Sequence, residues 1–192
     1  MNRNTLISGI TFIVALVAFF STVLFFNRKP ALRGIPVNPP IAAAEFSMTA
    51  ADGSDFSMSA QRGKVVLLLF GFVNCPEECP LTLAHFRQAL ELLGPDARDV
   101  RVVLVTTDPV RDTPQAMKNY LANFNPEFVG IPGDLEQIQK IWDEYGVEVM
   151  HGGESHSSYT YVIDRQGRQR VLFTPESLPE EIASDLKVLL AE

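Results

Sequence analysis

The chain has 192 residues, a formal net charge of −7 and 46% hydrophobic residues, which is the composition of an ordinary acidic domain. Residues 1–34 hold four of the 16 basic side chains and no acidic one, so residues 35–192 carry a charge of −11. This acidity argues against nucleic-acid binding, which needs a basic face to neutralise phosphates. Two cysteines are also too few for a disulfide-rich scaffold.

An apolar run without charge or proline extends from Thr5 to Phe26. As a helix it would reach roughly 33 Å, which is enough to cross a hydrocarbon core of about 30 Å. A buried core helix would rarely lack charge over six turns, and the hydrophobic part of a cleavable signal peptide has about 7–15 residues. The sequence therefore predicts a tail at 1–4 and a single transmembrane helix at 5–26.

The segment after this run, residues 27–44, contains four prolines and little apolar periodicity. It predicts an extended linker, followed by a folded domain over 45–192. The basic residues Arg28, Lys29 and Arg33 outnumber Arg3 on the other side of the run. Taken alone, this distribution favours a domain on the cytoplasmic side.

The domain alternates strand and helix patterns. The run from Lys64 to Phe72 is almost entirely apolar, as in a central strand buried on both faces, whereas the helical segments carry one apolar stripe each. Strands are predicted at 45–49 and 55–58 (a hairpin), 64–72, 100–106, and 158–164 and 168–173 (a second hairpin), with helices at 80–93, 114–124, 135–145 and 179–190. This order predicts an α/β fold with a central mixed sheet flanked by helices.

Both cysteines follow the predicted central strand, in the segment Asn74–Pro80 (NCPEECP). Cys75 and Cys79 form a C-x-x-x-C pattern between the strand and the start of a helix. Functional sites in such sheets lie at the carboxyl ends of strands, and a helix N-terminus lowers the pKa of a nearby thiol. Residues four apart can also bring two sulfurs to one centre if the segment curls into a turn.

Three interpretations of the pair stay open at this point. A disulfide across five residues would constrain few unfolded conformations, so a structural role is weak. A thiol–disulfide redox pair usually has two residues between its cysteines rather than three. A metal site is the third interpretation, since two thiolates suit Cu(I) and an added imidazole suits copper in both oxidation states.

The three histidines differ in their surroundings. His85 lies off the apolar stripe of its predicted helix, which favours a surface position. His151 and His156 lie in a polar loop just before the predicted strand 158–164. His156, next to that strand, is better fixed and is the stronger candidate for a third ligand, while His151 is a candidate for an alternative or transient one.

Three blocks of sequence carry a resemblance to a known family. They are Arg62–Leu83 (RGKVVLLLFGFVNCPEECPLTL), Val105–Leu121 (VTTDPVRDTPQAMKNYL) and His156–Gly167 (HSSYTYVIDRQG). In order and spacing they resemble the Sco/SenC/PrrC copper-binding proteins, which are assembly factors for the binuclear copper centre of cytochrome c oxidase. The resemblance implies one N-terminal transmembrane anchor and a thioredoxin-like domain.

The same resemblance implies the site. The family's copper ligands correspond to Cys75, Cys79 and His156, with no catalytic residue and no further cofactor. Its aspartate in the second block corresponds to Asp108, which we interpret as a loop organiser or partner contact rather than a ligand. The residues after it predict a turn into a helix capped by Thr113 or Asp112.

The implied function is that of a membrane-anchored metallochaperone without catalytic turnover. It would deliver copper, as Cu(I) or Cu(II), to the copper-bearing subunit of cytochrome c oxidase after receiving it from a copper donor chaperone. The alternative is a thiol–disulfide oxidoreductase that keeps the oxidase's copper-ligand cysteines reduced. Thioredoxin-type reductases have a proline where Ser157 and Ser158 stand, and peroxiredoxins have a threonine at the position of Phe72, so both departures favour metal binding.

The resemblance also implies a location. Family members hold the domain outside the cytoplasm, so we expect a single-pass protein of the cell membrane with its domain on the periplasmic or extracytoplasmic side, against the charge bias. The four-residue tail has no Arg- and Ser-rich transit character, which favours a bacterial source.

Overall fold

The computed structural model describes residues 13, 16–17, 19–20, 31–150 and 155–192, with only the backbone of Ser155 and His156. The chain divides into two compact units, residues 1–31 and 32–192. The predicted anchor at 5–26 lies mostly outside the described residues. In the parts of the chain that the structure describes, no helix has both the length and the apolar character needed to cross a bilayer. The anchor therefore stays a prediction.

The second unit is built on a mixed sheet, as the sequence predicts, and this sheet has six strands. Its strands are β1 (Ile35–Ala42), β4 (Val65–Gly71), β5 (Val100–Thr106), β6 (Val129–Ile131), β9 (Thr160–Ile163) and β10 (Arg168–Phe173), in the spatial order β1-β10-β9-β4-β5-β6. Strands β4, β5 and β6 are parallel, β9 runs antiparallel to β4, and β10 runs antiparallel to β9. The carboxyl ends of the three parallel strands consequently meet at one edge of the sheet.

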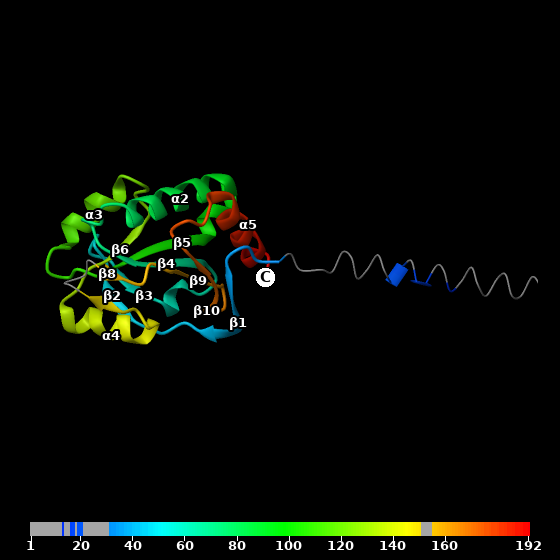
Figure 1. Cartoon of the computed structure of the whole chain (residues 1–192), viewed down its shortest axis with the longest axis horizontal. Coiled ribbons are helices and arrows are strands. Elements are labelled where there is room, and N and C mark those ends of the chain that lie inside the picture. Colours follow the sequence, from blue (N-terminus) through cyan, green and yellow to red (C-terminus); the bar gives the residue numbers. More distant parts are fainter. Residues whose placement is uncertain (1–12, 14–15, 18, 21–30, 151–154) are drawn as a thin grey trace, which may run out of the picture. The chain divides into compact units, whose positions relative to one another are not determined.

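Helices cover both faces of this sheet (Figure 1). Helices α2 (Glu78–Leu93), α3 (Pro114–Ala122) and α5 (Pro179–Leu190) lie over one face, and α4 (Leu135–Tyr145) lies over the other. Alternate residues of β4 enter the two cores because successive strand side chains point to opposite faces: Val65, Leu67 and Leu69 pack under α2 and α5, while Val66, Leu68 and Phe70 pack against α4. The predicted burial of this strand on both faces is confirmed.

The helix ends follow from local sequence. Asp134 and Gln137 form a capping box at the start of α4, and Gly146 ends it in a left-handed conformation (φ 65°) that suits glycine. Thr113 caps α3 by accepting a hydrogen bond from the Ala116 amide at 3.2 Å. Of the two predicted caps for α3, Thr113 is therefore the one used, and Asp112 is free for another contact.

Part of the predicted linker belongs to the sheet. Residues 27–44 are expected to form an extended tether, but Ile35–Ala42 pairs with β10 as the edge strand β1. Prolines are tolerated there because an edge strand leaves one side without ladder hydrogen bonds. Just before β1, the buried carboxylate of Asp185 on α5 accepts hydrogen bonds from the Arg33 and Gly34 amides at 2.8–2.9 Å. These contacts make residues 33–42 part of the folded unit.

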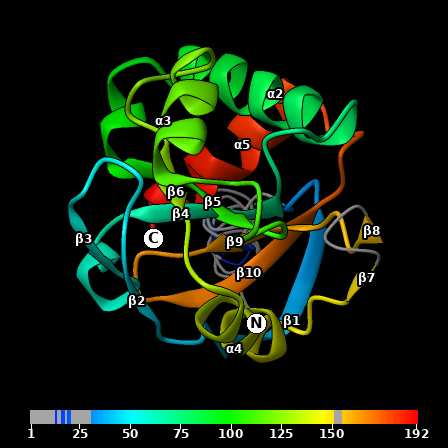
Figure 2. The same ribbon diagram turned by 90° about the vertical axis from the view of Figure 1, so that its left-hand side faces the viewer.

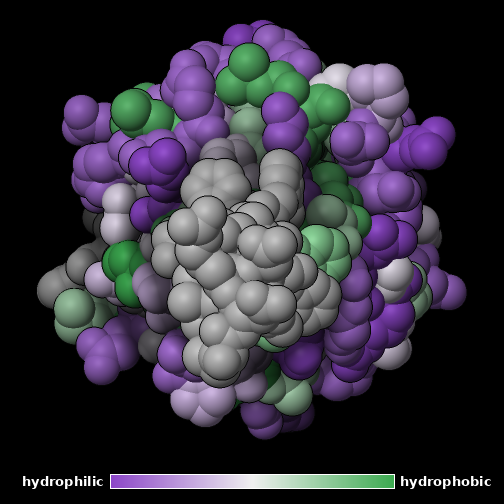
Figure 3. All heavy atoms as spheres, turned by 90° about the vertical axis from the view of Figure 1, so that its right-hand side faces the viewer, coloured by the Kyte–Doolittle hydropathy of each residue, from purple (hydrophilic) through white to green (hydrophobic). Residues whose placement is uncertain are grey.

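Two small hairpins lie outside the main sheet. Strands β2 (Ser47–Thr49) and β3 (Asp55–Ser57) form the first antiparallel pair, as predicted. Strands β7 (Val149–Met150) and β8 (Ser155–His156) form the second, where the sequence predicts only a polar loop. The sequence signal for β7 and β8 is weak because each of these two strands has only two residues. Figure 3 shows one face of the molecule, on which hydrophilic residues predominate around the grey atoms.

Candidate metal centre

The cysteine motif lies at the carboxyl edge of the sheet, directly after β4. The Cys75 amide donates to the Phe72 carbonyl at 3.2 Å, which curls the segment into a turn, and the Thr107 amide bonds the Gly71 carbonyl at 2.8 Å, which joins the ends of β5 and β4. Helix α2 begins at Glu78, two residues before the predicted start. Cys79 therefore lies in the first helical turn, where Pro80 is tolerated because its missing N–H would have no partner.

The turn brings the two cysteines together, and both are free thiols. The Cys79 amide donates to Cys75 Sγ, with 3.4 Å between nitrogen and sulfur. Cys75 is half-buried, whereas Cys79 is 2% exposed. Glu77, the N-cap residue, makes no side-chain bond to the helix end, so the Cys75 sulfur takes the place of the capping acceptor.

This arrangement shifts the pKa values of the two thiols in opposite directions. A hydrogen bond from Cys79, supported by the backbone amides of residues 77–79, lowers the pKa of Cys75 to about 5. The same hydrogen bond, burial and the charge on Cys75 raise the pKa of Cys79. The two opposite directions favour a thiolate at Cys75 and a thiol at Cys79 that donates to it. Binding of a soft metal ion to both sulfurs displaces the Cys79 proton.

Space for the inner sulfur comes from Gly71, the last residue of β4. A Cβ atom added there would lie 2.6 Å from Cys79 Sγ and 3.3 Å from Leu104 Cδ1. The first distance is shorter than any ordinary contact, and a strand position inside the sheet cannot shift easily. Gly71 is therefore a site residue that the cysteine spacing alone does not reveal.

Asp112, which is 2% exposed, stabilises the loop that carries the cysteines. Its two carboxylate oxygens accept from the Val73 amide at 3.2 and 3.3 Å, and one also accepts from Thr106 Oγ1 at 2.7 Å. Burial raises the pKa of Asp112 above its usual value, and the charge of Asp108 acts in the same direction. Asp112 thus connects the end of β5 to the turn that carries Cys75, a role not predicted from the sequence.

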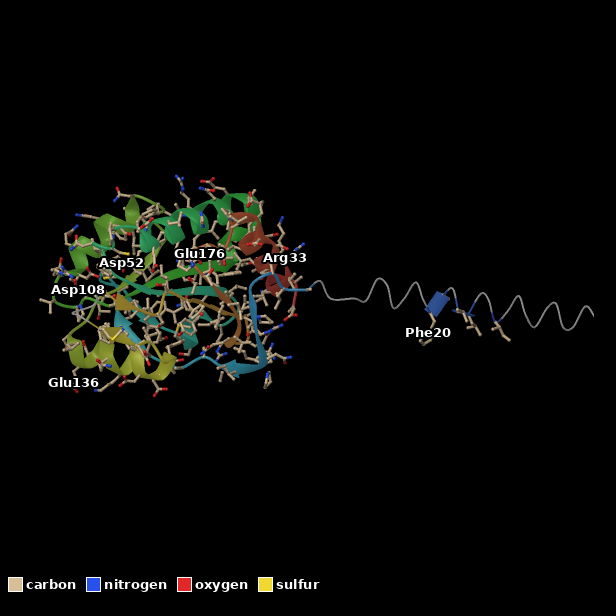
Figure 4. All side chains as sticks on the ribbon, in the orientation of Figure 1. Phe20, Arg33, Asp52, Asp108, Glu136 and Glu176 are labelled. Carbon is tan, nitrogen blue, oxygen red and sulfur yellow. The ribbon has the colours of Figure 1, made fainter. Side chains whose placement is uncertain are left out.

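Asp108 has contacts that fit the predicted organisation of its loop. Its carboxylate forms an ion pair with Arg111, its amide donates to Thr106 Oγ1 at 2.9 Å, and its carbonyl accepts from the Asp112 amide at 3.0 Å. Figure 4 shows Asp108 at the opposite end of the folded unit from Arg33, where the chain enters it. The cysteine edge is therefore the end of the unit remote from that entry point.

A side-chain contact joins the cysteine motif to the loop after β8. The Ser158 hydroxyl donates to the carboxylate of Glu78, the residue between the cysteines that begins α2. Ser158 and Glu78 line one small crevice with Cys79 and Thr82. Figure 2 shows the β7–β8 hairpin on the same side of the unit as the first turn of α2. The backbone of His156 lies in β8, paired with Val149, but its side chain and all of His151 lie outside the described residues.

The third histidine, His85, is engaged elsewhere. Its Nδ1 lies 3.0 Å from the Ser177 carbonyl, which joins α2 to the loop before α5. The ring is half-buried rather than fully exposed, so the surface position predicted from the helical pattern is only partly right. A helical pattern reveals the face a residue lies on, but not the loop that later covers it.

Near the cysteines, the hydroxyl of Tyr120 on α3 is buried and has no hydrogen-bond partner among the described residues. Burial raises the pKa of this phenol, and the charges of Cys79, Cys75 and Asp112 act in the same direction. Its ring packs edge-on against Phe124, with 5.3 Å between the ring centroids. Tyr120 thus places a polar group without a described partner within electrostatic range of the two cysteines.

The described side chains test how well this edge suits a metal ion. They contain no group of three or more His, Cys, Asp or Glu side chains that could hold one. The two sulfurs supply a soft pair, and the side chain of the predicted third ligand, His156, lies outside the described residues. An open cavity of about 890 Å³ lies between the β2–β3 hairpin and the loop at 109–114, but neither cysteine lines it. The ligand chemistry therefore points to the thiol pair rather than to this cavity.

Residues 37–191 match the sequence pattern of the SCO1/SenC family. The chain belongs to the SCO1/SenC family. The match covers the sheet from within β1 onward and all of its helices, including both cysteines and His156. It confirms the resemblance on the three sequence blocks.

Known SCO1/SenC proteins agree in sequence and in structure. SCO2-like protein RC0895 of Rickettsia conorii is 34% identical over 152 residues, which cover 74% of each chain. ScoI of Bradyrhizobium japonicum, solved with copper bound, is 34% identical with a TM-score of 0.72, over 78% of this chain and 99% of that one. Apo Sco1 of Thermus thermophilus is 31% identical with a TM-score of 0.74, over 83% and 98%. The fold is thus the thioredoxin-like α/β fold of Sco proteins.

Proposed function

We propose that this SCO1/SenC protein binds one copper ion through Cys75, Cys79 and His156 and delivers it to the binuclear copper centre of cytochrome c oxidase. The observation that carries the proposal is the pair of free thiols at the start of α2, where the Cys79 amide donates to Cys75 Sγ at 3.4 Å. Thiolate ligands select Cu(I), and an imidazole extends the site to Cu(II). The copper-bound relative ScoI supports the choice of metal.

The position of the pair suits transfer rather than permanent storage. Cys75 is half-buried at the end of the sheet, so an approaching partner can reach its sulfur, whereas Cys79 is enclosed beneath it. A cysteine of the receiving protein would displace Cys75 first, after which Cys79 and His156 release the ion. The donor would be a second copper chaperone, and the acceptor the copper-bearing subunit of the oxidase.

The proposal includes the anchor at residues 5–26 and a domain on the periplasmic or extracytoplasmic side of the cell membrane. Residues 33–42 are fixed on the folded unit, which leaves few residues between the predicted anchor and the domain. At about 3.5 Å per extended residue, the interval from Phe26 to Arg33 spans at most roughly 25 Å. The domain would therefore work close to the membrane that contains its acceptor.

A copper titration of the full chain in detergent tests this function. With Cu(I) under anaerobic conditions and with Cu(II), we expect one ion per chain and at least about tenfold weaker binding in Cys75→Ala, Cys79→Ala and His156→Ala, equivalent to about 1.4 kcal/mol. His85→Ala is the matched control, because this histidine bonds Ser177 away from the cysteines. Equal affinity in all four variants would contradict the proposal.

The reductase alternative keeps one observation in its favour, the unequal thiol pKa values. A thiolate at Cys75 could attack a disulfide of a partner, and Cys79 could then displace the partner's thiol, leaving a Cys75–Cys79 disulfide. Each such event consumes the two electrons of the dithiol. Rapid, repeated reduction of a protein disulfide by the copper-free chain, with an external thiol as reductant, would favour this alternative over delivery.

A further inference from the structure

We infer that the hydrogen bond from Ser158 to Glu78 positions the histidine-bearing hairpin against the cysteine pair and thereby sets the preference of the site for Cu(II) over Cu(I). This inference rests on the proposed function, since it concerns the same copper site. It assigns a positioning role to two residues that are not ligands. Both lie within the folded unit, and their side chains are described.

The first step is the location of the contact. Glu78 stands between the two cysteines, next to Cys79, and its carboxylate lies beside that residue in a shared crevice. Ser158 stands two residues after His156, in the loop that leads into β9. One hydrogen bond thus joins segments 80 residues apart in the sequence, each adjacent to a proposed ligand.

The second step is the weak attachment of the hairpin itself. Strands β7 and β8 form a separate two-stranded sheet with two residue pairs, Val149–His156 and Met150–Ser155, and neither strand belongs to the main sheet. A two-stranded hairpin of this size is marginal without other support. Among the described contacts, the Ser158–Glu78 hydrogen bond joins the segment after this hairpin to the cysteine motif.

The third step concerns what the hairpin contributes to copper binding. Two thiolates alone satisfy Cu(I), whereas Cu(II) gains from the added imidazole nitrogen. A contact that fixes the backbone next to His156 should consequently act mainly on the affinity for Cu(II). Contacts around metal ligands typically change metal affinity by about 10–100-fold when removed.

The experiment compares four single variants of the full chain, Ser158→Ala, Ser158→Thr, Glu78→Ala and Glu77→Ala, and the double variant that combines Ser158→Ala with Glu78→Ala. Ser158→Ala removes the donor without changing charge, and Ser158→Thr restores a hydroxyl. Glu77→Ala is the matched control, because it removes the same charge from the neighbouring exposed position, for which no side-chain hydrogen bond or ion pair is described. Melting temperatures of the metal-free variants show that each remains folded.

We expect Cu(II) affinity to fall at least about tenfold in Ser158→Ala and Glu78→Ala, with Cu(I) affinity changed by less than about threefold. The nitrogen hyperfine coupling in the Cu(II) spectrum should weaken in the same two variants. Ser158→Thr and Glu77→Ala should match the unmodified chain, and Ser158→Ala should add nothing to Glu78→Ala. The inference is overturned if Ser158→Ala retains full Cu(II) affinity and coupling, or if Glu77→Ala loses as much as Glu78→Ala.

A metal-free measurement separates this inference from the proposed function. If the hydrogen bond positions the hairpin, backbone amides from Ser155 to Thr160 should exchange with deuterium faster in Ser158→Ala than in the unmodified chain or Ser158→Thr. Equal exchange overturns the positioning role even if copper binds. Failure of the unmodified chain to bind copper overturns the proposed function, while the exchange rates still decide the role of the contact.

Discussion

Two buried aspartates at opposite edges of the same sheet have different surroundings. Asp164 lies in the β9–β10 turn, at the edge where β4 begins. Its carboxylate forms ion pairs with Arg168 and Arg170 and accepts hydrogen bonds from the Gln166 and Arg168 amides. These partners outweigh burial and lower the pKa of Asp164. Asp112, at the cysteine edge, bonds the neutral donors of Val73 and Thr106, and burial raises its pKa.

The difference indicates that one edge of the sheet mainly stabilises the fold, whereas the other carries the candidate site. At the Asp164 edge, the buried carboxylate is paired with Arg168 and Arg170 and accepts two backbone hydrogen bonds, so it stabilises the folded state. At the Asp112 edge, the buried carboxylate bonds neutral donors, and the Tyr120 hydroxyl has no hydrogen-bond partner among the described residues. We expect local stability to be lower there, as at sites that must accept and release a ligand.

The largest expected effect is at the paired edge. Asp164→Ala should lower the free energy of unfolding by about 3 kcal/mol, because it removes the buried partner of the exposed Arg168 and of the largely buried Arg170. Urea unfolding of the full chain in detergent measures this. The control is Glu136→Ala, which breaks the exposed pair with Lys140 and should cost no more than about 0.5 kcal/mol. Equal losses in the two variants would contradict the importance of burial here.

At the cysteine edge, Asp112→Asn should lower the free energy of unfolding by about 2 kcal/mol, because an amide group cannot accept from Val73 and Thr106 with both atoms. It should also weaken copper binding, since the Val73 amide holds the turn before Cys75. Parallel copper titrations of Asp112→Asn and Asp164→Ala measure the contrast. Unchanged copper affinity in Asp112→Asn would contradict a role of Asp112 in supporting the copper site.

The pH dependence of stability should have opposite contributions from the two carboxylates. Asp164 has a lowered pKa, so its contribution is present above the unfolded value of about 3.9 and is lost as the pH falls through the folded pKa. Asp112 has a raised pKa, so its contribution is present below about 3.9 and is lost as the pH rises through the folded pKa.

Urea unfolding at intervals between pH 3 and pH 6 checks these signs. Relative to the unmodified chain, stability should rise less steeply with pH in Asp164→Ala and more steeply in Asp112→Asn. Identical slopes in the three proteins would show that neither carboxylate changes its pKa on folding.

The smallest effect should come from Tyr120→Phe, which removes the unpaired hydroxyl beside the cysteines. The free energy of unfolding should stay the same or rise by no more than about 1 kcal/mol, because no hydrogen bond is lost. Tyr145→Phe is the matched control, since that hydroxyl donates to the Ala44 carbonyl at 3.0 Å and its loss should destabilise by about 1 kcal/mol. Thermal unfolding of both variants distinguishes them, and a larger loss in Tyr120→Phe would reveal a partner for its hydroxyl.

Much of the sheet is readable from local patterns. The continuous apolar run of β4 predicts its burial on both faces, and the spaced apolar residues predict the bounds of α4. The same local reasoning misplaces Ile35–Ala42, since an edge strand with prolines resembles a linker until its partner β10 is known. It also misses β7 and β8, whose two-residue strands have no period to detect.

The sequence by itself determined the cysteine spacing, its place between a buried strand and a helix, and the family blocks that imply His156 as a third ligand. These are local or collinear features, so they need no knowledge of distant contacts. The tertiary structure alone decided that Gly71 makes room for Cys79, that Asp112 holds the Cys75 turn, and that Ser158 reaches Glu78. Each of these joins residues that only the packing of sheet, helix and loop brings within contact distance, because hydrogen bonds and steric contacts act over a few ångströms whatever the separation along the chain.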